Sequence, residues 1–313
     1  MTKYKVVVSD QVFPSVDIER ALLAEIDADL TVASGDVEAV LATARDADAI
    51  LNTYLPWAAG SITRLERCKI IARYGIGFDN VDLKAASDAG IVVTNVPDYS
   101  VEEVATHALA LILASLRKIT LADGLMRSGT WSIDNFRPIR RLSTLTVGLV
   151  GYGRIARRIA APLAALGARI VAHDPYLNAG PDLPPLLDLD AVLAEADIVS
   201  LHLPLTDETR GMIDADALAG MKEGAILVNT SRGPLVDLDA VTSALREGRL
   251  GAAGLDVFDV EPLDPARVEG VPNLIVTPHM AYYSEEALAE SQRKAATQVV
   301  KVLTGQQPDY QVN

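Results

Sequence analysis

Three short segments of the sequence combine residues that could bind a small acid and move a proton. They are Asn229–Pro234, Leu255–Pro262 and Val276–Ala281. Arg232 offers a planar fork of N–H donors that matches a carboxylate or a carbonyl oxygen. His279 can donate or accept a proton because the ordinary pKa of imidazole lies near neutrality, and a neighbouring Glu261 would favour imidazolium and hold one tautomer. Reduction of a 2-keto acid requires this combination, together with a source of hydride.

A glycine loop between an apolar strand and an alanine-rich helix predicts a site for the hydride carrier. Gly151 permits a tight turn, and Gly153 lets the backbone approach a pyrophosphate. Ala156, at the third small position, allows close packing of helix on strand. The helix that opens at Arg154 aims unpaired N–H groups and its positive dipole end at the phosphates. This order of elements predicts a dinucleotide-binding βαβ unit.

Asp174 ends the second strand of that unit, about 20 residues after Gly153. An acid at this spacing binds the ribose hydroxyls of a dinucleotide. Its carboxylate would repel a 2′-phosphate. The sequence therefore predicts NAD(H) as the cofactor, in preference to NADP.

The segments that must position these residues alternate between strand-like and helix-like runs. The two kinds of run alternate through the first third of the chain. The strand-like runs there are Lys5–Ser9, Leu30–Ala33, Ala49–Asn52, Lys69–Arg73 and Ile91–Asn95, and the helix-like runs are Val16–Ile26, Val37–Arg45 and Val81–Ala89. After a long helix-like run at Val101–Leu116, strand-like runs recur at Val147–Val150, Val171–Asp174, Ile198–Leu201, Ala225–Asn229, Ala252–Asp256 and Leu274–Val276, and Glu285–Leu303 is helix-like. This alternation predicts an α/β fold with parallel sheets covered by helices on both faces.

The glycine loop starts deep in the chain, with an independent α/β region in front of it. We therefore expect two Rossmann-like, doubly wound domains with parallel sheets. Residues 1–98 with 285–313 are expected to form a flavodoxin-like substrate-binding domain, and residues 99–284 the NAD-binding domain. Ligands of such sheets bind at the carboxyl ends of the strands, so the active site is expected in the cleft between the domains.

Composition excludes several classes of function. The 313 residues are 50% hydrophobic and 22% charged, which is an ordinary balance for a soluble globular protein. The formal net charge of −14 argues against a nucleic-acid partner, because a duplex requires a cationic surface. We expect no membrane span, no secretory signal and no metal site. Cys68 is the only cysteine, which favours a reducing, cytoplasmic setting.

The order of the chemical segments resembles the D-2-hydroxyacid dehydrogenase family over nearly the whole chain. Arg73–Asp82 is similar to the family's substrate loop, in which backbone N–H groups receive the substrate carboxylate. His202–Pro204 with Thr209 is similar to its cofactor-side loop. The resemblance implies that Arg232, Glu261 and His279 form the catalytic triad. It also implies that Asp256 lies near the nicotinamide carboxamide.

Within the family, the chain resembles most closely the branch of the C-terminal binding proteins and the phosphoglycerate dehydrogenases. Segments such as Ser100–Glu103 and His279–Glu285 carry this likeness. Tyr282 stands where the corepressors of that branch have a tryptophan, so their ligand preference does not carry over. The sequence ends at Asn313, so we do not expect the appended regulatory domain of many phosphoglycerate dehydrogenases.

The resemblance and the motifs together define a candidate site. The predicted cofactor residues are Gly151, Tyr152, Gly153, Arg154, Ile155, Asp174, His202, Pro204, Thr209, Thr230 and Asp256. The predicted substrate residues are Tyr54, Leu55, Tyr74, Gly75, Ile76, Gly77 and Tyr282. Because the wall side chains are uncharged, we expect a small 2-keto or 2-hydroxy acid, as in a glyoxylate or hydroxypyruvate reductase, rather than 3-phosphoglycerate.

Several alternatives remain open from the sequence. The chain could be an NAD(H)-sensing, corepressor-like binding protein on the same scaffold, although sensing alone does not need a proton donor. It could also oxidise formate or phosphite. His107 and His173 are expected to be structural, whereas His202 has an equal claim to packing and to cofactor contact. Val101–Leu116 and Arg117–Ser143 are candidates for a homodimer seam by analogy with the family.

Overall fold

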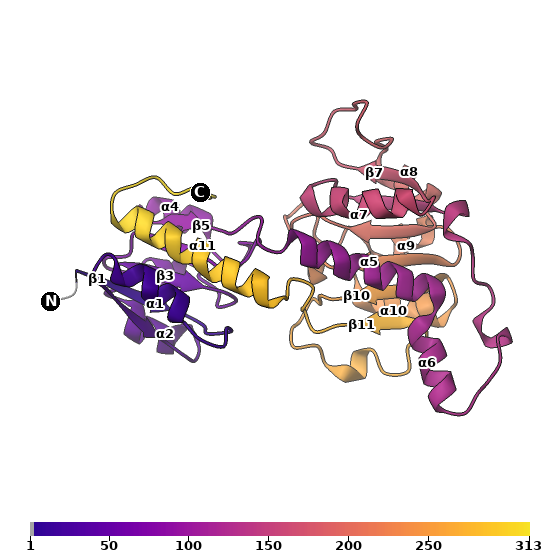
Figure 1. Cartoon of the computed structure of the whole chain (residues 1–313), viewed down its shortest axis with the longest axis horizontal. Helices are drawn as coiled ribbons and strands as arrows, with labels where there is room; N and C mark the ends of the chain where they lie inside the picture. The colour runs from indigo at the N-terminus through magenta and orange to yellow at the C-terminus, as the bar shows by residue number, and fades with distance from the viewer. Residues whose placement is uncertain (1–2) are drawn as a thin grey trace. The chain divides into compact units, whose positions relative to one another are not determined.

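The computed structural model describes residues 3–313, which form two compact units (Figure 1). The first unit runs from the N-terminus to Tyr99 and resumes at Ser284–Asn313, and the second unit is Ser100–Tyr283. Met1 and Thr2, which the predicted first domain includes, lie outside the described residues. In Figure 1 the first unit carries both ends of the colour scale, because the last helix of the chain belongs to it.

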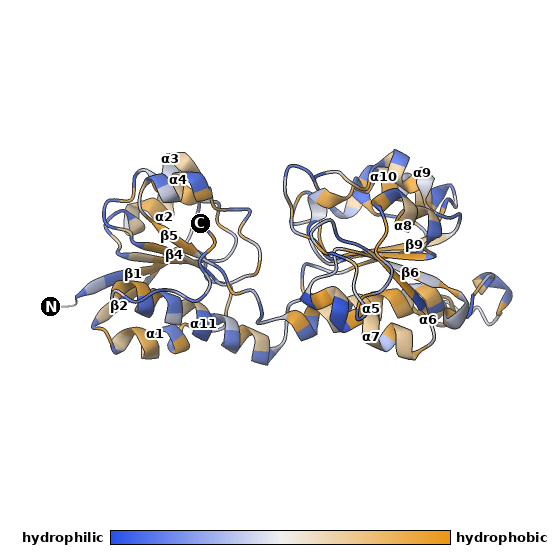
Figure 2. Cartoon of the chain, turned by 90° about the horizontal axis from the view of Figure 1, so that it is seen from above, coloured by the Kyte–Doolittle hydropathy of each residue, from blue (hydrophilic) through white to orange (hydrophobic). Residues whose placement is uncertain are grey.

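The first unit is built on a five-stranded parallel sheet with strand order β2-β1-β3-β4-β5. Its strands are β1 (Tyr4–Val8), β2 (Ala28–Val32), β3 (Ala49–Asn52), β4 (Ile70–Arg73) and β5 (Val92–Thr94). Its helices are α1 (Asp17–Ala24), α2 (Val37–Ala44), α3 (Ala59–Ile62), α4 (Leu83–Asp88) and α11 (Glu285–Leu303). Figure 2 shows α1 and α11 on one face of the sheet and α2, α3 and α4 on the other.

The second unit is built on a six-stranded parallel sheet with strand order β11-β10-β9-β8-β6-β7. Its strands are β6 (Thr146–Val150), β7 (Arg169–His173), β8 (Ile198–Leu201), β9 (Ala225–Asn229), β10 (Leu250–Leu255) and β11 (Leu274–Val276). Its helices are α5 (Val101–Arg117), α6 (Ile119–Arg127), α7 (Arg154–Ala165), α8 (Leu189–Glu195), α9 (Ala215–Gly220) and α10 (Leu238–Arg246). In Figure 2, α5 and α7 cover one face of this sheet, and α8, α9 and α10 cover the other. The predicted fold class, two doubly wound parallel sheets, is confirmed.

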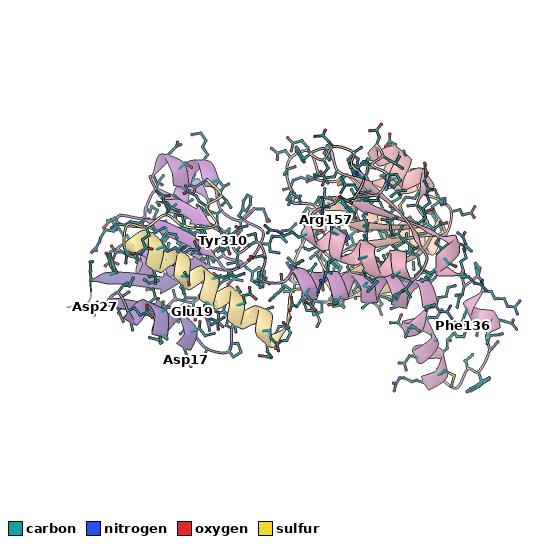
Figure 3. All side chains as sticks on the ribbon, turned by 45° about the horizontal axis from the view of Figure 1, so that its top comes forward. Asp17, Glu19, Asp27, Phe136, Arg157 and Tyr310 are labelled. Carbon is teal, nitrogen blue, oxygen red and sulfur yellow. The ribbon has the colours of Figure 1, made fainter. Side chains whose placement is uncertain are left out.

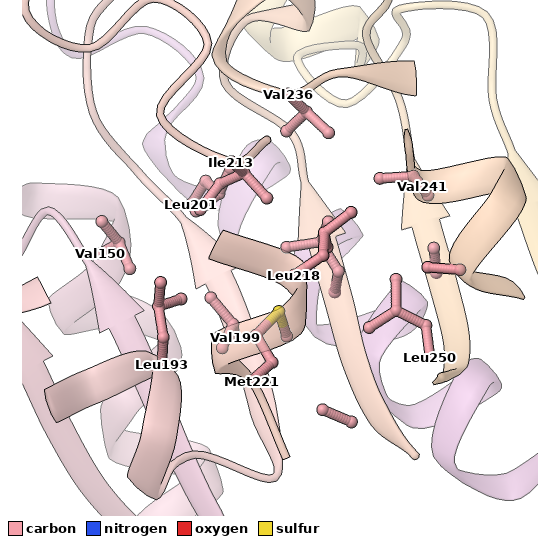
Figure 4. Close-up of a cluster of buried hydrophobic side chains, with 14 of the residues drawn as sticks. Val150, Leu193, Val199, Leu201, Ile213, Leu218, Met221, Val236, Val241 and Leu250 are labelled. Atoms are coloured by element: carbon pink, nitrogen blue, oxygen red, sulfur yellow. The ribbon is translucent and has the colours of Figure 1, made fainter. Parts of the chain in front are cut away.

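Burial on both faces explains why the central strands are continuous apolar runs. Every residue of β6 and of β9 is buried. Figure 4 shows one of the two resulting cores, in which Val150 and Val199 from the sheet meet Leu193 of α8 and Leu218 of α9. Packing on both faces holds the central strands in place, and with them the positions of their carboxyl ends. The loops that follow those ends carry the candidate site.

The segment after α5 contains a helix, α6, beyond the helix-like run predicted at Val101–Leu116. Lys118 adopts a left-handed conformation (φ 53°) that ends α5, and α6 begins at the next residue. Among the described residues, no single helix is long and apolar enough to cross a membrane. The pair α5 and α6 meets that test only when taken together, and it is bent by 59°.

Candidate active site

The glycine loop joins β6 to α7 in a conformation that only glycine satisfies. Gly151 has φ +83°, and a Cβ there would lie 2.4 Å from the carbonyl oxygen of His202. Gly153 precedes the first turn of α7 and makes no side-chain capping bond, and a Cβ built on it meets no atom within 4 Å. No side chain caps the first turn of α7, so the loop and the positive end of the helix fit the phosphates of a dinucleotide.

Asp174 follows β7 and lies against the glycine loop. Its Oδ2 accepts a hydrogen bond from the Tyr152 N–H at 3.0 Å, and its Oδ1 accepts one from the Tyr176 N–H at 3.0 Å. Each carboxylate oxygen has a second lone pair. The acid is thus fixed beside the phosphate loop with acceptor capacity left for ribose hydroxyls, which fits the predicted cofactor.

His202 follows β8 and stands over the same loop, with its N–H bonded to the carbonyl oxygen of Val150 at 2.7 Å. Burial lowers the pKa of the His202 imidazole to about 3, so the ring is neutral near pH 7. In the part of the chain that the structure describes, neither ring nitrogen has a hydrogen-bond partner, and the same is true of the buried Thr230 hydroxyl. Buried polar atoms without partners are unusual in a folded protein, and here they lie where a cofactor is expected.

The loop after β9 is held by its own side chains. Asn229 donates from Nδ2 to the carbonyl oxygen of Arg232 at 2.8 Å and accepts the Ser231 N–H at 3.0 Å. Ser231 donates to the Leu201 carbonyl oxygen at 2.7 Å, which ties the loop to β8. The Arg232 guanidinium donates from Nη1 to the Ser231 carbonyl oxygen at 2.8 Å. The backbone of Arg232 is therefore set firmly at the carboxyl edge of the sheet.

The loops after β9 and β10 touch at Gly233. A Cβ on Gly233 would lie 1.9 Å from the carbonyl carbon of Phe258, so any larger residue would force the two loops apart. The Phe258 N–H donates to Glu261 Oε1 at 2.8 Å. Through this contact the loop that carries Glu261 is packed against the loop that carries Arg232.

Glu261 and His279 form a hydrogen-bonded pair in the second unit, with Oε2 and Nδ1 2.7 Å apart. Burial opposes ionisation of Glu261, but the hydrogen bond and charge of His279, the Phe258 N–H and the charge of Arg232 outweigh it and lower the pKa of the carboxyl. An ionised carboxylate accepts only, so the Nδ1 of His279 carries a proton. Proton exchange with a substrate would then take place at Nε2 of His279.

The structure brings the three predicted catalytic residues together from three adjacent strand ends. Tyr282 joins them, with its ring 6.2 Å from the ring of His279 and at 82° to it. The remaining predicted substrate residues, Tyr54, Leu55 and Tyr74–Gly77, all belong to the first unit.

Within the first unit, the Tyr74 ring does not extend the aromatic wall that the sequence predicted. Tyr74 is 1% exposed, and its hydroxyl donates to Glu19 Oε1 at 2.7 Å. Glu19, on α1, also accepts from the Nε2 of Gln292 on α11, beside which Figure 3 shows it. Burial and the Glu19 carboxylate raise the pKa of Tyr74 well above its ordinary value. This buried carboxylate draws the ring inward, while the main-chain N–H of Tyr74 donates to the Asn52 carbonyl oxygen at 2.9 Å and its carbonyl oxygen accepts from Ser291 at 2.6 Å. Tyr74 therefore supports the turn from inside the unit.

The turn at Gly75–Gly77 presents its N–H groups on one side. The carbonyl oxygens of Gly75, Ile76 and Gly77 accept from Val96 N, Asn95 Nδ2 and Arg73 Nε at 3.1, 2.7 and 2.8 Å. A trans peptide points its N–H away from its C=O. The N–H groups that follow these carbonyls therefore point away from the body of the unit, as carboxylate binding requires.

The loop after β3 has an anchor that the sequence did not identify. The Asp10 carboxylate accepts the N–H of Thr53 at 3.0 Å and of Leu55 at 3.1 Å, and it also accepts the Tyr54 N–H. Asp10 follows β1, the strand next to β3. The sequence signal that could have identified it is an acid directly after a strand. It fixes the backbone of the loop and leaves the Tyr54 side chain 48% exposed.

Comparisons with known proteins agree with this architecture. The sequence model described as "D-isomer specific 2-hydroxyacid dehydrogenase, NAD binding domain" matches residues 109–281. The chain is 41% identical to D-3-phosphoglycerate dehydrogenase of Mycobacterium tuberculosis over 270 residues, which are 85% of this chain and 50% of that protein. The chain thus spans about half the length of the curated relatives it matches first.

Two solved structures are similar over almost the whole chain. D-lactate dehydrogenase from Aquifex aeolicus, complexed with NAD and lactic acid, is 30% identical, with 96% of each chain covered and a TM-score of 0.87. An acyclic imino acid reductase, Bsp5, in complex with NADPH and D-Arg, is 26% identical, with 99% of this chain and 100% of that chain covered and a TM-score of 0.88. Proteins with both nicotinamide cofactors thus share this fold.

Proposed function

The chain belongs to the D-isomer specific 2-hydroxyacid dehydrogenases, and we propose that it interconverts a 2-keto acid and a D-2-hydroxy acid with NAD(H). The observation that carries this proposal is the His279–Glu261 pair, 2.7 Å apart and next to Arg232, in the unit that holds the glycine loop. A binding module needs the glycine loop but not a proton donor held in one tautomer. The pair therefore favours catalysis over sensing.

In the proposed reduction, bound NADH supplies a hydride to the carbonyl carbon of the substrate. The protonated Nε2 of His279 gives its proton to the carbonyl oxygen, so that the C=O becomes CH–OH. Glu261 keeps the Nδ1 proton in place and favours the imidazolium form before the transfer. Arg232 binds the carboxylate or the carbonyl of the substrate with its planar fork and orients the carbon for attack. In the oxidation direction, neutral His279 accepts the hydroxyl proton.

We assign the substrate carboxylate to the turn at Tyr74–Gly77, on the outward N–H groups of Ile76 and Gly77. The candidate wall residues Tyr54, Leu55, Ile76 and Tyr282 carry no charge, which favours keto acids with a small uncharged side chain over a phosphorylated one. In this assignment the first unit binds the substrate and the second unit binds the cofactor.

We assign the cofactor to the glycine loop, with its ribose on Asp174. The cofactor would give hydrogen-bond partners to the His202 ring nitrogens and the Thr230 hydroxyl, which have none among the described residues. The other proposed contacts are Tyr152, Arg154, Ile155, Pro204 and Thr209. Asp256 stays in this set by resemblance, although the hydrogen bonds of its carboxylate go to the loop of His279. The Asp174 carboxylate favours NAD over NADP, because it would repel a 2′-phosphate.

We also propose a homodimer, built on α6 and the segment that follows it. Ile119, Met126, Trp131 and Ile133 are 48 to 86% exposed there, an unusual density of apolar side chains in contact with water. Sedimentation equilibrium of the wild type and of Trp131→Ser tests this, and a wild type that sediments as a monomer would refute it.

The experiment that tests the proposed reaction is a screen of NADH oxidation with small 2-keto acids. The panel consists of glyoxylate, hydroxypyruvate, pyruvate, 2-ketobutyrate and phenylpyruvate. Turnover of at least one of them, with loss of that turnover in His279→Ala, is expected. If NADH binds tightly and no member of the panel is reduced, the reductase assignment fails for these substrates and a sensing role gains support.

A further inference from the structure

His279 stands in a backbone conformation that is uncommon for residues other than glycine. Its φ is +52°, in the left-handed region that favours glycine because a Cβ crowds the backbone there. A residue persists in this conformation only when its surroundings hold it. The direction in which the ring leaves the backbone therefore depends on the contacts that fix the main chain on either side of His279.

Asp256 supplies those contacts. It follows β10, is fully buried, and accepts on one carboxylate oxygen from the Met280 N–H at 3.0 Å and on the other from the Ala281 N–H at 2.9 Å. Its main-chain oxygen accepts the His279 N–H at 2.8 Å. One residue thus binds the backbone at His279 and at the two residues that follow it.

Thr277, two residues before His279, belongs to the same network. Its hydroxyl donates to Asp256 Oδ1 at 2.5 Å. The Nε2 of His107, on α5, lies 3.0 Å from that hydroxyl oxygen and 3.6 Å from Asp256 Oδ1. The only proton of the hydroxyl is already given to Asp256. His107 Nε2 must therefore carry a proton and donate it to Thr277, so the chain of donors runs from His107 through Thr277 to Asp256.

We propose that His107, Thr277 and Asp256 are positioning residues that hold His279 in its left-handed conformation and so aim its Nε2 at the substrate. This inference rests on the proposed function, because it assigns a purpose to the geometry of the proton donor. Glu261 fixes the ring from the Nδ1 side, and the Asp256 network fixes the main chain that carries the ring. His107 acts at a distance and does not touch the reacting atoms.

Loss of the network should lower kcat more than it raises KM. Arg232 and the Tyr74–Gly77 turn, to which substrate binding is assigned, do not depend on Thr277. A ring misplaced by a fraction of an ångström no longer meets the carbonyl oxygen in a reactive geometry, and such errors cost up to about 100-fold in rate. A merely structural role would instead lower the amount of folded enzyme and leave kcat per folded site unchanged.

Matched variants separate these outcomes. Thr277→Val removes the hydroxyl, whereas Thr277→Ser keeps it. His107→Leu removes the donor, whereas His107→Gln offers an N–H at nearly the position of Nε2. Thr106→Val, the neighbouring hydroxyl on α5, bonds only to main-chain oxygens of its own helix and serves as the control.

We expect Thr277→Val and His107→Leu to lower kcat at least about tenfold with the KM of the keto acid within about threefold of wild type. Thr277→Ser, His107→Gln and Thr106→Val should stay near the wild-type kcat, with sites counted by NADH titration. Wild-type kcat in both Thr277→Val and His107→Leu, or losses that the conservative variants do not restore, would overturn the inference.

A readout that needs no turnover distinguishes failure of this inference from failure of the proposed function. The chain has four histidines, so nitrogen-15 spectra of the histidine-labelled protein can be assigned by substitution. We expect a proton on His107 Nε2 and a shift of the His279 ring signals in Thr277→Val. His107 protonated only on Nδ1, or His279 signals unmoved, would overturn the inference even in an active enzyme. If the spectra agree but no keto acid is reduced, the proposed function fails instead.

Discussion

The Nδ1 of His279 lies 2.7 Å from Oε2 of Glu261, whose other oxygen is held by the N–H of Phe258 at 2.8 Å. The carboxylate is thus fixed by the backbone on one side and presents its charge to the imidazole on the other. In the proposed reaction the two groups act as one unit, with the Nδ1 proton of His279 held by Glu261. The pH dependence of the reaction should therefore report on both residues.

Glu261→Gln should move the alkaline limit of keto-acid reduction to lower pH. The glutamine offers one acceptor oxygen where the carboxylate accepts from both Phe258 and His279, and it removes the negative charge that favours imidazolium. The proton-donating form should therefore be lost earlier as the pH rises. The measurement is the pH profile of kcat/KM for reduction, with Glu247→Gln, an exposed acid on the surface, as the control. An unchanged profile would show that Glu261 has no part in the proton transfer.

Arg232→Lys should raise the KM of the keto acid and lower kcat, with a combined loss in kcat/KM of about tenfold or more. A lysine keeps the positive charge but cannot reproduce the planar fork, so the substrate is bound more weakly and is poorly oriented. NADH affinity, measured by fluorescence titration, should change little. Arg169→Lys, a surface arginine paired with Glu195, is the matched control. Wild-type kinetics in Arg232→Lys would show that the substrate contact is assigned to the wrong residue.

Asp174→Ala should narrow the preference for NADH over NADPH. The wild type is expected to use NADH with the higher kcat/KM, because the carboxylate beside the glycine loop repels a 2′-phosphate. The same substitution removes the acceptor of the Tyr152 and Tyr176 N–H groups, so kcat/KM for NADH should also fall. Equal use of the two cofactors by the wild type would refute the assignment of NAD specificity to Asp174.

Asp197 should contribute stability that acid removes. It is buried before β8 and accepts from the Thr146 N–H at 2.8 Å, with Arg140 at 2.5 Å and Lys222 at 3.3 Å. Burial opposes its ionisation, but these three partners outweigh burial and lower its pKa. Because the folded-state pKa lies below the unfolded value, the stabilisation is present above the ordinary aspartate pKa and is lost as the pH falls through the folded-state value.

Asp197→Asn should therefore lower the free energy of unfolding at pH 7 by about 2 kcal/mol, and the difference from wild type should shrink below about pH 4. Urea unfolding at a series of pH values measures it. Asp182→Asn, an exposed aspartate in the loop after β7, should change stability little at any pH. A deficit in Asp197→Asn that stays constant down to pH 3 would show that the charge of Asp197 is not the cause.

Much of the site could be predicted from the sequence because its signals are local. The turn at Gly151, the helix after Gly153 and the acid at Asp174 lie within one βαβ unit, and their spacing follows from that unit. The long helix α11 was predicted with its observed bounds, and in the structure Ser284 caps it and two acids stand in its first turn. The strand ends that carry Arg232 and His279 follow from the alternation of apolar runs.

The remainder depends on contacts between residues that are distant in sequence. The inward position of the Tyr74 ring is set by Glu19, 55 residues away. The contact of His107 with Thr277 spans 170 residues. Neither pairing leaves a pattern in its own segment. The α6 helix was missed because a left-handed Lys118 interrupts the apolar periodicity that continues from α5.

The most direct test of the central claim is the configuration of the product, together with the rate, when NADH reduces a keto acid of the panel. We expect the wild type to form the D-2-hydroxy acid, resolved by chiral chromatography. In His279→Ala, kcat should fall by about 10²–10⁴-fold while NADH affinity is retained, because the imidazole is assigned to the substrate. An L-product, or His279→Ala with kcat near wild type, would contradict the assignment of His279 as the proton donor of a D-2-hydroxyacid dehydrogenase.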